Sequence, residues 1–469
     1  MKYVMFTFDG HGIPIAIKLQ EEGNDILVAQ IEDASKVKMK EDKESKERRL
    51  TLGDGIVKKE PADKVLEKLL KLSDAEKRDY FIICDFNNQY YYSEPLIEAG
   101  FTGLLPTKED MELEQDRAKA KEFVLQHFPY LNVPETYEFK TIKEGIEFLK
   151  KEQDIYVLKG NYEECATIVP KSNDVNIARE ELIEALERDK QNYERQGFVF
   201  ERKIIRGIEF IPEGVWMDGV LLGVSVDIET KYIGSGNIGY QVGCAQDLVF
   251  LLSLDHSIYE MFLKPHEEIA KQRKGLFIGD AGVIWDIDKQ KFYFLEYCQG
   301  RFGFNCIFTE LSLFDKVSEY FERIRNLIPL YNWQRNQPTH GASVRIFNLL
   351  RGEDRRIIKD IKIKVANPKF VWLWDVKKEG KDYVNAGYDK NLAVITGRGY
   401  DLYQAVEDCY ENLRLNFYFP EMYYRPKFDF LNESYDGSIV TRYNFVVNFD
   451  WERYKKEYDR RNQRNQTNS

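Results

Sequence analysis

An alternating apolar run that ends on an acid is the segment that most constrains this chain. The run Phe292-Tyr-Phe-Leu-Glu-Tyr-Cys-Gln-Gly-Arg-Phe-Gly-Phe-Asn305 begins as a strand, reaches Glu296 and continues into a glycine-containing turn. A carboxylate at that point of a strand is placed to hold Mg²⁺ against nucleotide phosphates. The pattern also fits an ordinary strand end that faces solvent, so the rest of the chain has to decide between the two.

The size and composition of the chain indicate two to four globular domains. With 469 residues, of which 43% are apolar, it can build real hydrophobic cores. The formal net charge of -11 repels phosphate polymers, so we expect no nucleic-acid partner. We expect no cleavable leader, and the sequence contains no long apolar run and no Cys-x-x-Cys spacing. We therefore expect a cytoplasmic protein in a reducing compartment, with no membrane contact.

The first hundred residues read as a β-loop-α-β unit. A β-rich run over residues 2–8 is followed by Asp9-Gly-His-Gly12, a helical stretch over 14–22 and a strand over 25–30. Gly10 and Gly12 in such a turn let backbone amides approach a phosphate at a helix N-terminus. A tight turn without a ligand is the alternative.

The predicted fold class is α/β and α+β. We expect a Rossmann-like domain over residues 1–105, a domain of two α+β lobes over 106–335 and a strand-rich module over 336–450. Residues 451–469 are polar, and we expect a disordered tail there. The predicted helices outside the first domain lie at residues 108–127, 176–195 and 402–413.

Charged residues stand at the ends of successive predicted strands in the middle domain. Lys159 ends one strand, Glu201 and Lys203 close the next, Glu209 opens the following one and Glu296 comes late. Lysine can offset phosphate charge, and carboxylates can bind ribose hydroxyls or Mg²⁺. Each residue alone also fits a solvated surface position, so their order is the informative feature.

That order resembles the ATP-grasp superfamily and, more narrowly, the phosphoribosylamine–glycine ligase family. The helix Leu113-Glu-Gln-Asp-Arg-Ala-Lys-Ala-Lys-Glu-Phe-Val124 has Arg117 at the position of the family's phosphate-facing lysine. The strand Tyr156-Val-Leu-Lys159 is similar to the one that carries its second lysine. Ile205-Arg-Gly-Ile-Glu209 resembles its nucleotide hinge, and Lys231-Tyr-Ile-Gly-Ser-Gly-Asn-Ile-Gly239 its substrate loop.

The C-terminal region supports the narrower resemblance. Three segments follow, in order, the last strand, the helix and the closing strand of the family: Asn391-Leu-Ala-Val-Ile-Thr396, Gly399-Tyr-Asp-Leu-Tyr-Gln-Ala-Val-Glu-Asp408 and Glu421-Met-Tyr-Tyr-Arg425. ATP-grasp ligases of other families usually lack this module.

The resemblance implies an ADP-forming carboxylate–amine ligase of purine biosynthesis. It would use ATP with Mg²⁺ or Mn²⁺ to join glycine and phosphoribosylamine through an acyl phosphate, as a monomer or weak dimer. The implied site consists of nucleotide-binding Arg117, Lys159, Glu201, Lys203 and Glu209, metal-binding Glu296 and Gln299, catalytic Arg301 and Asn237, and substrate-binding Gly10, Gly12, Lys231 and Gly239.

Three segments depart from the family pattern. The phosphate lid reads Gly160-Asn-Tyr-Glu-Glu-Cys-Ala-Thr167, with one glycine and two acids. Cys298 stands where the family's second metal ligand is expected, with Gln299 beside it, and Cys is a poor Mg²⁺ ligand. The first loop lacks the phosphoribosyl-binding arginine and acid. A ligase with a changed amine substrate and a degenerate protein that binds nucleotide or a partner without ligation are therefore both compatible with the sequence.

Overall fold

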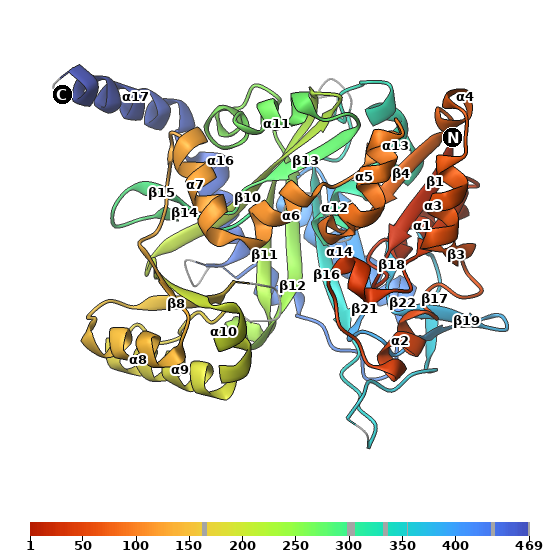
Figure 1. The fold of residues 1–469 in the computed structure, drawn as a ribbon, viewed down its shortest axis with the longest axis horizontal. Helices are drawn as coiled ribbons and strands as arrows, with labels where there is room; N and C mark the ends of the chain where they lie inside the picture. Colours follow the sequence, from red (N-terminus) through yellow and green to blue (C-terminus); the bar gives the residue numbers. More distant parts are fainter. Residues whose placement is uncertain (162–166, 298–304, 332–335, 354, 433–436, 468–469) are drawn as a thin grey trace. The chain divides into compact units, whose positions relative to one another are not determined.

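The computed structural model describes residues 1–161, 167–297, 305–331, 336–353, 355–432 and 437–467 (Figure 1). The chain forms two compact units. Unit 1 comprises Met1–Met111, Phe210–Asp280 and Gln299–Tyr454, and unit 2 comprises Glu112–Glu209, Ala281–Cys298 and Lys455–Ser469.

Unit 1 begins with a parallel sheet in the order β5-β4-β1-β2-β3. In β1, Val4 lies opposite Leu27 of β2 and Ile82 of β4. Helices connect the strands, as parallel pairing requires. The elements are β1 (Lys2–Thr7), α1 (Ile13–Glu21), β2 (Asp25–Gln30), η1 (Ala34–Val37), α2 (Lys43–Arg49), β3 (Lys59–Pro61), α3 (Ala62–Leu70), α4 (Asp74–Lys77), β4 (Tyr80–Cys84), η2 (Asn87–Gln89), α5 (Tyr90–Glu98) and β5 (Gly103–Leu104).

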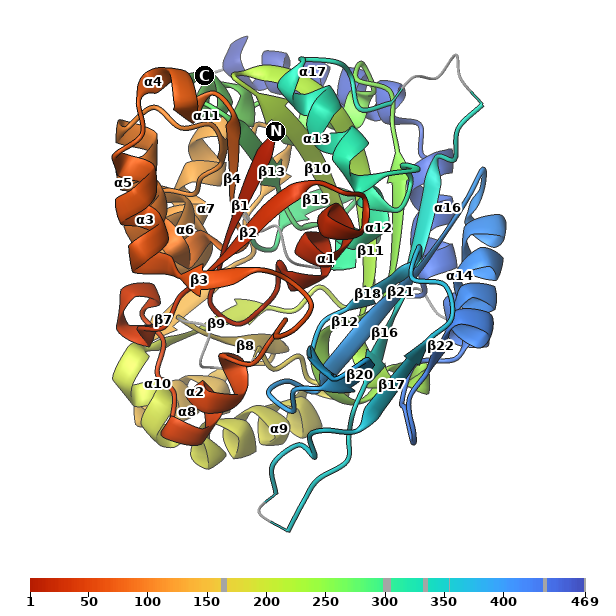
Figure 2. The ribbon, with the colours of Figure 1, turned by 90° about the vertical axis from the view of Figure 1, so that its right-hand side faces the viewer.

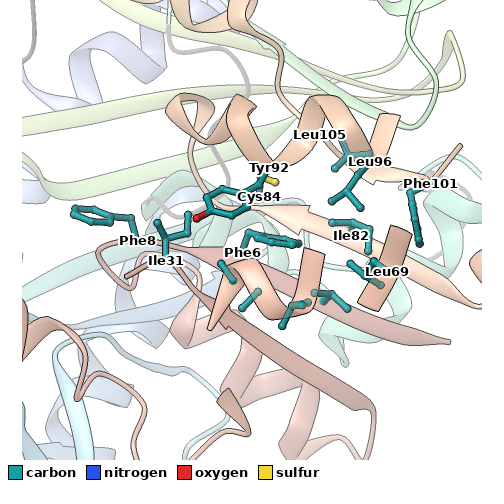
Figure 3. Close-up of a cluster of buried hydrophobic side chains, with 14 of the residues drawn as sticks. Phe6, Phe8, Ile31, Leu69, Ile82, Cys84, Tyr92, Leu96, Phe101 and Leu105 are labelled. Atoms are coloured by element: carbon teal, nitrogen blue, oxygen red, sulfur yellow. The ribbon is translucent and has the colours of Figure 1, made fainter. Parts of the chain in front are cut away.

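One face of this sheet packs on α3 and α5 through a hydrophobic cluster. Phe6 and Ile82 are fully buried there, with Leu96 of α5 and Leu69 of α3. Phe8 and Ile31 lie at one end of the cluster and Phe101 at the other (Figure 3). The cluster packs these strands closely against the two helices.

The sheet of unit 1 continues through antiparallel strands in the order β13-β10-β11-β12-β16-β21-β18. β16 and β21 lie side by side and pair over their lengths (Figure 2). Asp218 and Gly219 both have positive φ in the turn between β10 and β11, and Asp-Gly is a favoured pair in such turns. The elements are β10 (Gly207–Met217), whose first residues belong to unit 2, β11 (Val220–Gly234), η3 (Ser235–Asn237), β12 (Ile238–Leu251), η4 (Tyr259–Leu263), α11 (His266–Gln272), β13 (Leu276–Asp280), α12 (Asn305–Leu311), α13 (Val317–Arg325), β16 (His340–Phe347), β18 (Val371–Leu373) and β21 (Asn391–Gly399).

A smaller sheet, β19-β20-β17-β22, and helix α14 complete unit 1. Asp401 caps α14 by accepting a hydrogen bond from the amide of Gln404. The elements are β17 (Lys362–Val365), β19 (Val376–Glu379), β20 (Asp382–Asn385), α14 (Leu402–Asn416), β22 (Phe417–Tyr418), α15 (Lys427–Phe430) and α16 (Ile439–Asn448).

Unit 2 has an antiparallel sheet in the order β7-β9-β8, covered by α8, α9 and α10. Phe198, Phe200 and Leu158 form its fully buried centre. A second group pairs β14 with β15 and β15 with β6. The elements are α7 (Arg117–His127), β6 (Leu131–Asn132), β7 (Thr136–Phe139), α8 (Ile142–Lys151), β8 (Tyr156–Gly160), α9 (Val175–Arg188), α10 (Lys190–Gln196), β9 (Phe198–Arg202), β14 (Val283–Asp286) and β15 (Lys291–Phe294).

Two predicted helices are each divided in the structure. The helix predicted at 108–127 is α6 (Lys108–Gln115) and α7, because Asp116 leaves the helical conformation and caps α7 at the amide of Lys119. The helix predicted at 176–195 is divided into α9 and α10 at Asp189.

The predicted disordered tail is wrong over most of its length, because residues 451–467 form helix α17 (Trp451–Thr467). Within unit 2 this helix is held by aromatic contacts: the rings of Tyr458 and Tyr130 are 5.1 Å apart, and the Tyr130 hydroxyl donates to Asp459 at 2.8 Å. No helix in the described ranges is long and apolar enough to cross a membrane.

The structure also divides the chain differently from the predicted domains. Residues 106–335 contribute segments to both units. The reason is hydrogen bonding: β12 pairs with β16 of the C-terminal region, and β13 pairs with β5 of the N-terminal domain. One sheet therefore passes through segments that the sequence assigned to three domains.

Candidate functional site

A buried group of charged side chains lies in unit 2, on neighbouring strands and on α7. Val157 lies opposite Glu201 and Lys159 lies opposite Val199, so Lys159 and Glu201 share one face of the β8–β9 pair. The Nζ of Lys159 forms an ion pair with Oε1 of Glu201. Lys121 of α7 approaches the other carboxylate oxygen, Oε2, at 2.8 Å. We call Lys121, Lys159, Glu201, Arg117 and Glu296 the cationic cluster.

The burial of this ion triad is nearly complete. The side chains of Glu201, Lys159 and Lys121 are 3%, 8% and 10% exposed. Burial alone would raise the pKa of Glu201, but Lys159 and Lys121 outweigh it and lower the pKa. Burial lowers the pKa of Lys121, against the attraction of Glu201. Two buried cations share one carboxylate, so the triad has an excess of positive charge.

Arg117 and Glu296 extend the cluster toward solvent. The Nε of Arg117 donates to the carbonyl of Gly160 at 3.2 Å, and its Nη1 lies 3.9 Å from Oε2 of Glu296. The Glu296 backbone is fixed because its carbonyl accepts from the amide of Gly282 at 2.8 Å. Lys159 also donates to the carbonyl of Leu295, at 3.3 Å. The structure therefore brings together Arg117, Lys159, Glu201 and Glu296, which the sequence selected from distant segments.

Lys121 is the member of the cluster that the sequence analysis missed. It lies one helical turn after Arg117 on α7, and side chains four residues apart share a helix face. This four-residue spacing from Arg117 is the sequence signal that could have identified Lys121. The cluster thus contains three cations and two acids, and a polyanion such as a triphosphate would neutralise the excess.

Lys203 and Glu209, which the sequence also assigned to the nucleotide, are not among the residues of the cationic cluster. The Lys203 amine donates to the carbonyl of Pro170 at 2.6 Å and to Oδ1 of Asn173 at 3.1 Å. It therefore fixes the segment before α9, while Glu209 is half-buried near the start of β10. Their predicted nucleotide contacts stay predictions.

The predicted second metal ligand, Gln299, lies outside the described residues, as do Cys298 and Arg301. Within the described ranges, no group of three or more His, Cys, Asp and Glu side chains could hold a metal ion. Glu296 is therefore the one candidate metal ligand from the sequence that the structure describes.

In unit 1, Asn237 occupies a structural position. It has φ of 58°, and its Oδ1 accepts from Nη1 of the fully buried Arg425 at 2.9 Å. The same guanidinium nitrogen donates to the carbonyl of Tyr232 at 3.0 Å. These bonds hold the turn between β11 and β12, where Lys231 is half-buried and Gly239 exposed. The predicted catalytic role of Asn237 and substrate roles of Lys231 and Gly239 stay predictions.

Unit 1 also contains buried acid pairs that the sequence did not indicate. Glu213 of β10 hydrogen-bonds Glu310 of α12, and Asp227 of β11 hydrogen-bonds Asp247 of β12. Burial raises the pKa of all four carboxyls, and the neighbouring acid raises those of Glu213 and Asp227 further. Each pair can therefore hold a shared proton.

Gly10 and Gly12 lie at the carboxyl end of β1. Gly10 has φ of +85°, and a Cβ there would meet the Leu52 side chain at 2.6 Å. The amide of Gly12, at the start of α1, donates to Oδ2 of Asp85 at 2.6 Å. The chain's own carboxylate thus takes the amide that the sequence assigned to a phosphate.

Comparison with known proteins relates the fold to two kinds of enzyme. No family model and no curated protein sequence matches this chain. Among solved structures, phosphoribosylamine–glycine ligase from Thermotoga maritima is similar at 16% identity, with a TM-score of 0.63 over 91% of this chain and 99% of that chain.

Biotin carboxylases are also similar to this chain in fold. The biotin carboxylase domain of 2-oxoglutarate carboxylase from Hydrogenobacter thermophilus is 15% identical, with a TM-score of 0.59 over 94% of this chain and 97% of that chain. Biotin carboxylase from Campylobacter jejuni is 13% identical, with a TM-score of 0.56 over 97% and 96%. The chain therefore has the fold of these enzymes, which confirms the predicted α/β and α+β fold class.

Proposed function

We propose that this chain is an ATP-dependent, ADP-forming carboxylate–amine ligase that works as the phosphoribosylamine–glycine ligases do. The observation that carries the proposal is the cationic cluster. Burying Lys121 and Lys159 around a single carboxylate costs free energy unless an anion completes the set. Nucleotide phosphates are the anions in two of the similar structures, because the Hydrogenobacter domain is in complex with MgADP and the Campylobacter enzyme is a β-γ-ATP complex.

In this proposal the cluster binds and positions ATP. Lys159, Lys121 and Arg117 neutralise the phosphates, and Glu209 takes the ribose hydroxyls. Glu296 supplies a hard oxygen ligand for the Mg²⁺ or Mn²⁺ that accompanies the phosphates. Binding of the triphosphate replaces the long Arg117–Glu296 contact, and both side chains turn to the nucleotide.

The reaction proceeds in two displacements. A carboxylate oxygen of an amino acid such as glycine attacks the γ-phosphorus, the bond to the β-phosphate oxygen breaks and ADP leaves. The amine then attacks the acyl carbon, phosphate leaves with the bonding electrons, and the amine nitrogen loses a proton as the amide forms. Positioning and charge neutralisation supply most of the rate enhancement.

The test is ADP release from MgATP over a panel of amino acids and amines, with phosphoribosylamine included. An arm with biotin and bicarbonate tests the chemistry of the other neighbours. Glu296→Ala should abolish substrate-dependent release, whereas Glu187→Ala, on the exposed side of α9, should not change it. If release from the native chain equals the Glu296→Ala background with every pair, the ligase proposal fails. ATP binding without turnover would then favour a non-catalytic nucleotide-binding protein.

A further inference from the structure

The carboxyl ends of β1, β2 and β4 meet at a reversal of strand order in unit 1. The chain goes from β1 to β2 and β3 on one side, and then returns to β4 on the other side of β1. Ligands of open parallel sheets bind outside the carboxyl ends at such a switch point. Thr7 lies opposite Gln30 there, and Asp85 follows the last residue of β4. We call this region, with Asp9, Asn88 and Gln89, the carboxyl edge.

The amides that could bind a phosphate at this edge are already used. The Gly12 amide donates to Asp85, and the Ile13 amide donates to the carbonyl of Gly10 at 3.0 Å. Pro14, the next residue of α1, has no amide hydrogen. The start of α1 therefore presents a carboxylate of the chain in the position where other helices of this kind hold a ligand's phosphate.

The buried cation next to the edge is used as well. Arg49 is fully buried, and its Nε and Nη2 donate to the two carboxylate oxygens of Glu41 at 2.8 and 2.6 Å. Its Nη1 donates to the carbonyls of Phe8 at 2.9 Å and Ile31 at 2.7 Å. A phosphate could bind Arg49 only by breaking this set, which leaves Glu41 and two carbonyls without their donor.

The edge offers acceptors instead. Three buried amide side chains have a bonded nitrogen and an oxygen with no donor among the described residues. The nitrogen of Gln30 donates to the Phe8 carbonyl at 3.0 Å, that of Asn88 to the Val37 carbonyl at 3.2 Å and that of Gln89 to Oδ1 of Asp85 at 2.5 Å. A buried acceptor without a donor costs about 1–3 kcal/mol. A ligand with N–H and O–H groups would relieve that cost.

We propose that the carboxyl edge binds a primary amine without a phosphate group. The ammonium or hydroxyl hydrogens of this amine bond to the oxygens of Gln30, Asn88 and Gln89 that have no donor among the described residues, and the negative charge of Asp85 favours a cation. The proposal rests on the edge alone.

The test compares amines with their phosphate esters on the full-length protein. The probes are ethanolamine and O-phosphoethanolamine, D-glucosamine and D-glucosamine 6-phosphate, putrescine and inorganic phosphate, each titrated by calorimetry and by ligand-detected NMR. We expect at least one phosphate-free amine to bind, and its phosphate ester to bind about tenfold more weakly, a difference of about 1.4 kcal/mol.

Two variants locate the binding at the edge. Asp85→Asn and Gln89→Met should each weaken the bound amine about tenfold, the worth of one hydrogen bond to a charged group. Gln126→Met, on exposed α7 surface, is the matched control. A circular dichroism spectrum like that of the native chain shows that a variant is folded. Gln89→Met, which keeps the side-chain length, serves as the test if Asp85→Asn does not fold.

Three results overturn the inference: no amine of the panel binds, a phosphate ester or inorganic phosphate binds more tightly than the free amine, or binding is unaffected by both variants. These results are distinct from failure of the proposed function. Amine binding at the edge without any ADP release would refute the ligase and keep the site. ADP release with any amine would support the ligase and would leave the inference about the edge to be decided by the titrations.

Discussion

The cationic cluster of unit 2 and the carboxyl edge of unit 1 both bury polar groups, but with opposite demands. The cluster holds Lys121 and Lys159 around one carboxylate, with Arg117 and Glu296 beside them. The edge holds Asp85 and three amide oxygens that have no donor among the described residues, and its neighbouring cation, Arg49, donates to Glu41 and to two backbone carbonyls. One region lacks an anion, and the other lacks donors.

This difference shows that a glycine at a strand end or helix start does not by itself determine the charge of the ligand that binds there. Both regions lie where strands end, and both contain glycine near a helix start or strand end. At Gly160 the backbone carbonyl binds Arg117, so cations collect there. At Gly12 the backbone amide binds Asp85, so an anion of the chain already occupies the helix terminus. The side chain that hydrogen-bonds to the backbone at each place therefore determines whether a negative or a positive ligand is favoured.

Removing a lysine from the cluster should have the largest effect. Lys159→Met keeps the length of the side chain and removes the charge, so we expect ADP release to fall roughly 1000-fold, the upper range for loss of one group that stabilises transferring charge. The measurement is kcat/KM for MgATP, with ATP affinity by calorimetry. Lys150→Met, on exposed α8, is the control and should retain full activity. Equal rates for the two variants would show that the cluster is structural only.

Removing the shared acid should separate stability from binding. In Glu201→Gln the two lysines remain buried beside each other without a counter-charge, and we expect the free energy of unfolding to fall by about 3 kcal/mol. Because pyrophosphate can replace the lost charge, it should raise the melting temperature of the variant more than that of the native chain. Glu187→Gln on α9 should change neither quantity. A variant that pyrophosphate stabilises no more than the native chain would contradict an anion site at the cluster.

Much of the cluster was predictable, because its members follow a strand pattern. Lys159 and Glu201 each end an alternating run, and antiparallel pairing then places them on one face. Lys121 was harder to select, since α7 is rich in Lys, Glu and Ala and no apolar stripe shows which side faces the sheet. The break at Asp116 was missed for a related reason: Asp fits both a helix interior and a cap, and only the capped amide of Lys119 distinguishes them.

The carboxyl edge was not predictable in the same way. Gln30, Asn88 and Gln89 are neutral residues of types that usually lie at the surface, and their burial depends on strand order rather than on local pattern. The prediction of a disordered tail was wrong for a related reason. Its composition is that of a disordered segment, but Tyr458 and Asp459 bind Tyr130 more than three hundred residues earlier. Long-range contacts of this kind leave no periodic signal in the sequence.

The charge of Asp85 can be followed through pH. Burial and the nearby Asp9 raise its pKa from 3.8 to about 6, although His11, Thr7 and the Gly12 amide oppose the shift. Between about pH 4 and pH 6 the folded chain keeps a proton that the unfolded chain has lost, so its stability should fall as pH rises through this window. Compared with that of Asp85→Asn, the free energy of unfolding of the native chain should fall by roughly 2 to 3 kcal/mol across the window, at about 1.4 kcal/mol per pKa unit. Urea unfolding of both proteins at several pH values measures this difference, and parallel curves would mean that Asp85 does not carry the buried charge.

The smallest effect is expected at Lys203, which the sequence grouped with the nucleotide-binding residues. Its amine already donates to the Pro170 carbonyl and to Asn173. Lys203→Met removes two hydrogen bonds at a half-buried site, so we expect about 1 kcal/mol of lost stability. ATP affinity should change less than threefold, because the triad of Lys121, Lys159 and Glu201 is untouched. A loss of ATP affinity as large as that of Lys159→Met would contradict this prediction and would show that Lys203 binds the nucleotide. Lys203, which follows β9, would then belong to the cationic cluster.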